Sequence, residues 1–289
     1  MNSSPTRFDR RRGRRGAALL AWVLIALAPL LGCQSISLAP GNGSENTRFL
    51  ARLLERGELR VGMTGAQPPL NMRNRSGDLI GLDVDLARAL ADAMGVRLVL
   101  VETPFAELLT DLQEGRLDLV ISSLTITPSR NARVAFAGPY LISGSSLLTR
   151  KALIPELQDM SGLNSPERTW AALEGSTGEA LINEAFPLAK YVPIDDQATA
   201  VERIDRGEID GFIADLPSVS FQLARHPDLG LATLPSPFTT EPLGIALPPN
   251  SPLFSNLVQN YLNTLDSTGQ LIQMKARWLH AGDWLSEIP

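Results

Sequence analysis

The sequence predicts an α/β protein made of two similar lobes, each containing a largely parallel sheet. From residue 59 onward, short strand-like runs alternate with helical patterns, and this alternation is typical of parallel sheets covered by helices on both faces. A helix followed by a strand at residues 108–123 recurs as a similar unit at residues 200–215. The chain has 289 residues, 44% of them hydrophobic, which is enough for two ordinary hydrophobic cores.

The first half of the chain is predicted to fold as a β-α-β-α-β unit. Asp83 is a suitable N-cap for the first helix and Gly95 a suitable stop. Pro104 suits the first turn of the second helix, which Gly115 would end. The predicted elements are a strand at 59–63, a helix at 83–95, a strand at 96–102, a helix at 104–115 and a strand at 117–121.

The second half repeats part of this pattern. In both repeated units a helix ends at glycine, and an apolar residue followed by an aspartate, Asp118 or Asp210, opens the next strand. The final helical pair has no further β-α-β unit to cover, so we expect it to pack on the first lobe. The other predicted elements are a strand at 169–173, a helix at 175–186, strands at 190–194 and 241–251, and helices at about 252–267 and 269–279.

Residues 1–32 are predicted to be a secretory signal. Six arginines precede an apolar run at residues 17–31, and this run is shorter than the roughly 20 apolar residues of a membrane span. Residues 30–33, Leu-Leu-Gly-Cys, resemble the lipobox of bacterial lipoproteins. Lipid on Cys33 would then anchor the protein to a membrane, with residues 33–48 as a flexible tether. A chance cysteine beside a cleavage site is the alternative.

The composition excludes several function classes. The formal net charge is −5, and residues 1–32 hold six arginines and one aspartate, so the processed chain would be near −10. An acidic body without a basic stripe argues against nucleic acid as a partner. With two isolated histidines and one cysteine, we expect no metal site and no cofactor. No catalytic signature is present, so an enzyme is not expected.

A strand ends in polar side chains at residues 120–130, VISSLTITPSR. Ligands of open parallel sheets bind at the carboxyl ends of strands. Thr127 can cap a helix that starts at Pro128, and Arg130 can then bind a carboxylate. A capped helix with a solvated arginine is the alternative. The hydroxyls that accompany Arg130 favour a carboxylate clamp; they belong to Ser122, Ser123 and Thr125.

Asp215 occupies the place in the second unit that Ser123 holds in the first. If the lobes face each other, this carboxylate meets the clamp across a cleft. Thr177 lies near the start of another helix, whose N-terminus also suits an anion. The site would then hold a zwitterion, with its ammonium at Asp215 and its carboxylate at Arg130. A plain helix-capping role for Asp215 stays open.

These residues lie in motifs that resemble the periplasmic amino-acid-binding proteins of ABC importers, the family 3 solute-binding proteins. The matching stretches include RGELRVGMTG, GDLIGLDVDLARALADAMG, LLTDLQEGRLDLVISSLTITPSR, LEGSTGEA and GEIDGFIAD. The resemblance covers about residues 53–279 and implies a two-lobed Venus-flytrap fold, in which two mixed, mainly parallel sheets are joined by a two-crossing hinge. The implied hinge crossings lie near residues 143–151 and 237–243. The implied lobes are residues 49–146 with 241–289, and residues 147–240.

The resemblance also implies roles for individual residues. Arg130 would bind the ligand carboxylate and Asp215 the ammonium, and Phe105 would pack on the ligand side chain. The residues implied to assist are Ser123, Thr125 and the backbone of Thr177 at the carboxylate, and Ser122 at the ammonium.

Two positions depart from many relatives of that family. Gln67 replaces an aromatic residue, and Thr64 stands where several binders of basic amino acids have a carboxylate. A ligand stacked between two rings is therefore less favoured, and a polar or small aliphatic amino acid is expected.

The implied function is that of a monomeric, lipid-anchored protein of the periplasm or cell envelope that delivers an amino acid to an ABC permease. Two alternatives use the same fold: a cyclohexadienyl dehydratase, which acts on prephenate or arogenate, and a sensory or regulatory binding module.

Overall fold

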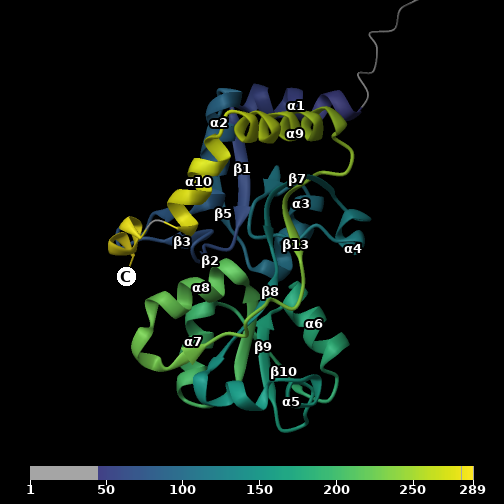
Figure 1. Ribbon diagram of the computed structural model, residues 1–289. Coiled ribbons are helices and arrows are strands. Elements are labelled where there is room, and N and C mark those ends of the chain that lie inside the picture. The colour runs from purple at the N-terminus through teal and green to yellow at the C-terminus, as the bar shows by residue number, and fades with distance from the viewer. Residues whose placement is uncertain (1–44, 281, 289) are drawn as a thin grey trace, which may run out of the picture. The chain divides into compact units, whose positions relative to one another are not determined.

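The computed structural model describes residues 45–280 and 282–288 (Figure 1). The predicted signal at residues 1–32 and the predicted lipid site at Cys33 lie outside the described residues. Across residues 45–280 and 282–288, every helix is too short or too polar to span a bilayer.

The first lobe contains a five-stranded mixed sheet in the order β5-β1-β6-β13-β7. Strands β5, β1 and β6 are parallel, whereas β13 is antiparallel to both β6 and β7. The strands of this sheet are β1 (Glu58–Met63), β5 (Arg97–Glu102), β6 (Leu119–Val120), β7 (Ala135–Ser143) and β13 (Glu241–Leu247). A small antiparallel sheet beside it is formed by β2 (Ala66–Gln67), β3 (Asn71–Arg73) and β4 (Leu79–Ile80).

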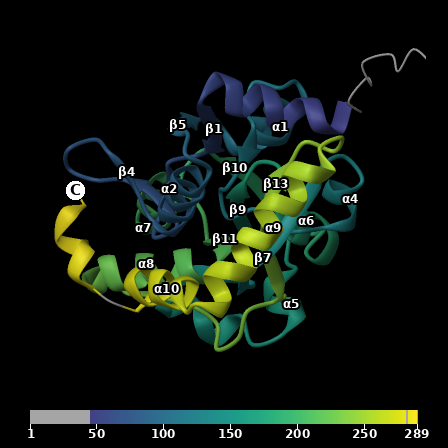
Figure 2. The same cartoon turned by 90° about the horizontal axis from the view of Figure 1, so that it is seen from above.

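Helices from both ends of the described chain cover this lobe. Helices α1 and α9 contact each other near their N-terminal ends, where the ring centroids of Phe49 and Phe254 are 5.3 Å apart, and they diverge from there in the view from above (Figure 2). Helix α10 packs on α2, and Trp278 Nε1 donates to Asp85 Oδ2 over 2.7 Å. The helices of this lobe are α1 (Glu45–Arg56), α2 (Leu82–Met94), η1 (Phe105–Glu107), α3 (Leu108–Gln113), α4 (Pro128–Asn131), α9 (Pro252–Ser267), α10 (Gln270–Leu279) and η4 (Asp283–Glu287).

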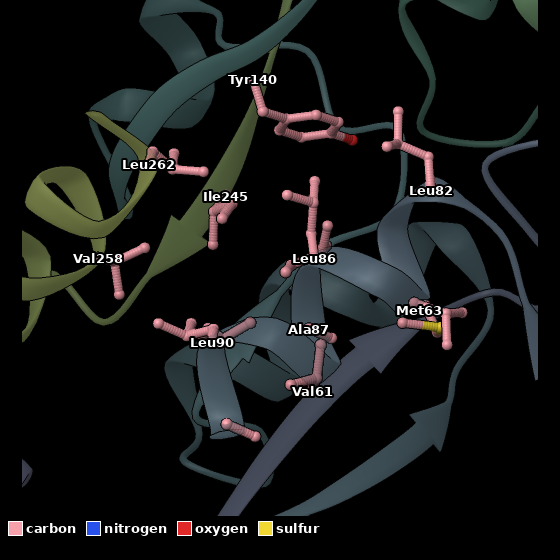
Figure 3. Packing of buried hydrophobic residues seen from close by; sticks show 14 of the residues in the cluster. Val61, Met63, Leu82, Leu86, Ala87, Leu90, Tyr140, Ile245, Val258 and Leu262 are labelled. Atoms are coloured by element: carbon pink, nitrogen blue, oxygen red, sulfur yellow. The ribbon is translucent and has the colours of Figure 1, made fainter. Parts of the chain in front are cut away.

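The core of the first lobe joins segments that are far apart in sequence. Leu86 and Leu90 of α2 are four residues apart, so they project from one face of the helix. That face packs between Val61 of β1 and the C-terminal residues Ile245 and Val258 (Figure 3). Burial of such side chains contributes roughly 1.5–3 kcal/mol each, and this packing fixes the strand ends that carry the site.

The second lobe repeats the arrangement around a second five-stranded sheet, in the order β10-β9-β11-β8-β12. Strands β10, β9 and β11 are parallel, and β8 is antiparallel to its neighbours. The elements of this lobe are β8 (Ser145–Arg150), η2 (Lys151–Glu156), α5 (Met160–Leu163), β9 (Thr169–Leu173), α6 (Thr177–Ala185), β10 (Lys190–Ile194), α7 (Gln197–Asp205), β11 (Gly211–Asp215), α8 (Leu216–Arg225), η3 (Pro227–Leu229) and β12 (Leu231–Ala232).

The repeated aspartates have the same structural role in both lobes. The Asp118 carboxylate accepts the backbone N–H of Arg60 over 2.8 Å, and the Asp210 carboxylate accepts that of Thr169 over 2.9 Å. Each aspartate also pairs with an arginine of its lobe, at 2.9 Å for Arg60 and 3.1 Å for Arg150. The sequence repeat therefore corresponds to one way of joining neighbouring parallel strands.

The chain passes between the two sheets twice. The first crossing is Gly144, which separates β7 from β8, and the second comprises residues 233–240, between β12 and β13. The crossings run side by side, because Glu241 pairs with Ser143 and Phe238 N donates to Ser145 O over 2.8 Å. A side chain at Gly144 would collide with the carbonyl of Thr239, so glycine permits this close approach.

Three local expectations were wrong. Helix α2 begins at Leu82 after Gly81, and Asp83 is a buried residue of its first turn rather than its cap. The predicted helix at 104–115 is divided into a short 3₁₀ turn and α3, although Gly115, in a left-handed conformation, follows the end of α3 as predicted. The strand predicted at 117–121 is regular only at Leu119–Val120.

Candidate ligand-binding site between the lobes

A polar cavity of about 30 Å³ lies where the two lobes meet. Small-molecule sites usually enclose about 300–1,000 Å³, so in this arrangement the lobes are nearly in contact. A ligand of amino-acid size can enter only if the lobes separate. Both lobes contribute polar or aromatic side chains to the lining of this cavity. Those of the first lobe are Gln67, Phe105, Ser123 and Thr125; Ser145 lies at the start of β8 beside the first crossing, and the others of the second lobe are Ser176, Thr177 and Asp215.

Ser123 has an unusual backbone that turns the chain into the cavity. Its φ is +50°, a left-handed value that is uncommon for residues other than glycine. Its N–H donates to Asp83 Oδ2 over 3.0 Å. Tyr140 Oη and Asn71 Nδ2 also donate to the Asp83 carboxylate, at 2.8 and 2.7 Å. Burial raises the pKa of Asp83 to about 6, although these hydrogen bonds oppose the shift. Asp83 therefore stabilises the turn that presents Ser123.

Arg130 extends from α4 across the boundary between the lobes. Thr127 caps this helix as predicted, since its hydroxyl accepts the N–H of Arg130 over 3.2 Å. The guanidinium donates to the carbonyl of Thr125 in its own lobe over 2.9 Å and to that of Gly175 in the second lobe over 3.0 Å. Its Cζ lies 5.6 Å from the ring centroid of Phe105. Burial lowers the pKa of Arg130 below its usual 12.5, and the guanidinium stays protonated at neutral pH.

Asp215 approaches the cavity from the opposite lobe. It ends β11 and precedes α8, and its side chain makes no capping hydrogen bond. Instead its carboxylate accepts the hydroxyl of Ser123 across the boundary. Burial raises the pKa of Asp215, and the hydrogen bond from Ser123 lowers it by a smaller amount, so that the pKa is about 7. An incoming ammonium group would supply the opposite charge that this carboxylate lacks.

Gln67 connects the cavity to a buried network that includes Ser122. The Ser122 hydroxyl donates to Gln67 Oε1 over 2.7 Å and accepts the N–H of Thr64 over 3.1 Å. The Thr64 hydroxyl lies 3.0 Å from Gln67 Oε1 and 2.9 Å from Asn71 Oδ1. Gln67 lines the cavity, whereas Thr64 lines a neighbouring hollow of about 350 Å³ that shares Phe105 with it. Ser122 is fully buried beneath this surface.

Glu241 is a charged residue of the site that the sequence interpretation missed. It is 5% exposed and begins β13 at the end of the second crossing. Its carboxylate accepts the hydroxyls of Thr125 and Thr177, at 2.6 and 2.8 Å. The prediction for Thr177 concerned its backbone, whereas the structure shows its side-chain hydroxyl bonded to Glu241. The available sequence signal was an acidic residue at the first position of the strand expected at 241–251.

The predicted residues fall into two groups. The residues that line the cavity are Asp215, Ser123, Thr125, Thr177, Phe105 and Gln67. Arg130 is not part of this lining but lies beside it, in contact with Thr125 and Phe105. Ser122 and Thr64 lie behind this lining, within hydrogen-bond distance of Gln67. Across residues 45–280 and 282–288, no group of three or more His, Cys, Asp or Glu side chains is arranged to hold a metal ion.

These features define a two-lobed binding protein with charged groups of both signs at the boundary between its lobes. The family model of the bacterial extracellular solute-binding proteins, family 3, matches residues 59–281, so the chain belongs to this family. The matched range includes the second lobe, both crossings and most of the first lobe, and it leaves out α1 and η4.

Relatives of known name include binding proteins and an enzyme. The chain is 28% identical to a cyclohexadienyl dehydratase of Pseudomonas aeruginosa over 253 residues, 88% of this chain and 94% of that protein. It is 27% identical to the ABC transporter arginine-binding protein 1 of Escherichia coli, over 76% of this chain and 90% of that protein.

Solved structures also resemble the chain. A binding component of an ABC transporter from Wolinella succinogenes, complexed with lysine, is 37% identical with a TM-score of 0.76, over 80% of this chain and 99% of that one. An ancestral amino-acid-binding protein described as a precursor of cyclohexadienyl dehydratase is 32% identical with a TM-score of 0.74, over the same shares.

Proposed function

We propose that the protein captures an L-amino acid between its lobes and delivers it to an ABC permease. The observation that carries this proposal is that Asp215 of the second lobe lines a small cavity between the lobes, while the Arg130 guanidinium of the first lobe lies beside it, on the carbonyl of the lining residue Thr125. Their placement on two separate lobes suits a ligand that carries a carboxylate and an ammonium group. Family membership supports amino-acid binding and association with a transporter.

Capture would exchange contacts between the lobes for contacts to the ligand. Arg130 donates to the Gly175 carbonyl, and a ligand carboxylate is a stronger, charged acceptor for the same guanidinium. The ammonium takes its place at Asp215, with Ser122 and its network supporting the strand end nearby. Because both charges are paired in the closed form, neither bears the full cost of burial. Closure of the lobes by hinge motion at the two crossings follows.

We propose a polar or small aliphatic amino acid as the ligand. The Gln67 carbonyl oxygen already accepts from Ser122, so the surface beside Phe105 is polar rather than a second aromatic ring. The guanidinium of a bound arginine would stack on Phe105 but would find no second aromatic ring on its other face. The Wolinella relative was solved in complex with lysine, so L-lysine is the basic amino acid to compare with polar and small ones in a binding test.

We further propose that the chain acts as a lipid-anchored monomer in the periplasm or cell envelope. Residues 1–32 would be removed, and lipid on Cys33 would hold the tether of residues 33–48 at the membrane. The moving lobes would be residues 49–146 with 241–289, and residues 147–240. Loss of membrane association in Cys33→Ala tests the anchor.

A second candidate is a cyclohexadienyl dehydratase activity, favoured by the relative of that name. Prephenate loses carbon dioxide and its hydroxyl group in this reaction, and the departing hydroxyl needs a proton. Asp215, whose pKa burial raises to about 7, is partly protonated at neutral pH and could donate it. Phenylpyruvate formation from prephenate by the purified protein, lost in Asp215→Asn, would establish this activity.

A thermal-shift screen with the standard L-amino acids tests the proposed function. We expect at least one polar or small amino acid to raise the melting temperature, because a ligand that binds only the folded protein stabilises it. L-Lysine and L-arginine should give smaller shifts at the same concentration. Stabilisation only by sugars or dicarboxylates would refute the zwitterion site.

A further inference from the structure

The Glu241 carboxylate joins four segments of the chain. Oε1 accepts the hydroxyls of Ser145 and Thr239, at 2.5 and 2.7 Å; Ser145 directly follows the first crossing, and Thr239 belongs to the second. Oε2 accepts the hydroxyls of Thr125 and Thr177, at 2.6 and 2.8 Å, and these residues belong to the first and second lobes. One oxygen thus connects the two crossings, and the other connects the two lobes.

These hydrogen bonds set the direction in which each hydroxyl donates. Burial raises the pKa of Glu241, but the four hydroxyl donors outweigh it, and the pKa lies below its ordinary 4.5. An ionised carboxylate only accepts hydrogen bonds, and a hydroxyl has one proton and two lone pairs. Thr125, Ser145 and Thr177 therefore direct their protons at Glu241. All three also line the cavity, where they present lone pairs.

We propose that Glu241 is a positioning residue for ligand capture. By accepting these hydroxyl protons, it links the lobes in their closed arrangement and makes the hydroxyls of Thr125, Ser145 and Thr177 acceptors for a ligand ammonium group. Glu241 is not among the residues that line the cavity, so it acts through the hydroxyls. A ligand carboxylate is then left to Arg130 and backbone N–H groups. This inference rests on the proposed amino-acid binding.

Two consequences distinguish this role from plain structural support. The bond between Glu241 and Thr177 joins the end of a crossing to the second lobe, so its loss should shorten the lifetime of the closed complex and raise the dissociation rate. The orientation of the hydroxyls should also affect how strongly the protein prefers an amino acid, which has an ammonium group, over an α-hydroxy acid, which has none. An α-hydroxy acid lacks the ammonium protons that these lone pairs would accept, so the wild-type protein should bind it poorly.

Glu241→Gln and Thr177→Val, singly and together, test the inference. The new side chain in E241Q keeps the size of glutamate but replaces one oxygen by an NH2 group, which forces the two hydroxyls that donate to that oxygen to reverse their direction. Glu202→Gln is the matched control, because Glu202 is a residue of α7 whose side chain is 68% exposed. The probes are the L-amino acid with the largest thermal shift in the screen and the α-hydroxy acid with the same side chain. Affinity is measured by calorimetry and dissociation by stopped flow.

We expect E241Q to weaken amino-acid binding by about tenfold to a hundredfold, the range for a lost hydrogen bond to a charged group, mainly through faster dissociation. T177V should give a smaller loss, and the double variant should lose less than the product of the two, because both changes remove the same bond. E241Q should also narrow the preference for the amino acid over the hydroxy acid. E202Q should match the wild type.

The possible failures are distinguishable. If no L-amino acid stabilises the wild-type protein, the proposed function fails and this inference fails with it. If the wild type binds an amino acid and E241Q binds it equally well, this inference alone is overturned. The inference would also be overturned if the loss of affinity in the double variant equalled the product of the two single losses. It would be overturned as well if E241Q preferred the amino acid over the hydroxy acid as strongly as the wild type does. T177V tests the same bond if E241Q does not fold.

Discussion

Asp215 and Glu241 are two carboxylates at the same boundary between the lobes, yet their surroundings shift their pKa values in opposite directions. Asp215 accepts one hydroxyl, from Ser123, and burial raises its pKa to about 7. Glu241 accepts four hydroxyls, which hold its pKa below the ordinary value in spite of its burial. The four donors at Glu241, against one at Asp215, favour the charged form of Glu241, and the nearby charges of Glu241 and Asp83 raise the pKa of Asp215 further.

This difference suggests a division of labour. Glu241 is already satisfied by the protein and is suited to hold the crossings and hydroxyls in place. Asp215 is under-satisfied and is suited to receive a charge from outside. A binding protein that must open and close benefits from this arrangement, because the carboxylate that lacks partners gains them only when a cationic group enters.

Removal of either proposed ligand-binding charge should have the largest effect. Arg130→Ala or Asp215→Ala should weaken amino-acid binding by about 2–5 kcal/mol, since each leaves the opposite charge buried and unpaired in the complex. Calorimetric titration of each variant measures the loss. Unchanged affinity in both variants would mean that the site lies elsewhere.

The stability of the unliganded protein should depend on pH through Asp83. Burial raises its pKa from 3.8 to about 6, so its protonated form is favoured by folding. Its contribution is full below pH 3.8, is lost as the pH rises through about 6, and amounts to a change on the order of 3 kcal/mol.

Denaturant unfolding of the wild type and Asp83→Asn between about pH 4 and pH 8 isolates this contribution. The neutral variant lacks the carboxyl group, so the stability difference, wild type minus variant, should fall with rising pH. A difference that is constant over this range would show that Asp83 titrates normally.

Ligand affinity should depend on pH in the opposite sense through Asp215. Its raised pKa, about 7, means that the carboxyl is mostly protonated below that pH and must lose its proton to bind an ammonium. Affinity should therefore decrease by up to about tenfold for each pH unit below the pKa. Calorimetry from about pH 5 to pH 8 measures the slope, which should vanish in Asp215→Asn. A slope retained in that variant would point to another group.

Local signals in the sequence were sufficient for most elements of the fold. The bounds of α9, Pro252–Ser267, match the predicted range, because proline opens the helix and the apolar spacing is regular. Thr127 before Pro128 is also a local capping pattern, and it is confirmed. The repeated unit correctly indicated two similar lobes.

The features that were missed depend on residues far apart in the chain. Glu241 takes donors from four separate segments, the most distant 116 residues away, and no spacing rule joins them. Asp83 precedes a helical pattern and so resembled a cap, but its partner Tyr140 lies 57 residues away. Burial of a polar side chain against distant partners is decided by tertiary packing, which a single sequence does not display.

A crystal structure of the protein with its best-stabilising L-amino acid is the most direct test of the zwitterion site. We expect the ligand carboxylate within hydrogen-bond distance of the Arg130 guanidinium and the ammonium within hydrogen-bond distance of the Asp215 carboxylate, in the cavity between the lobes. A ligand bound outside this cavity, or with its ammonium away from Asp215, would contradict this expectation.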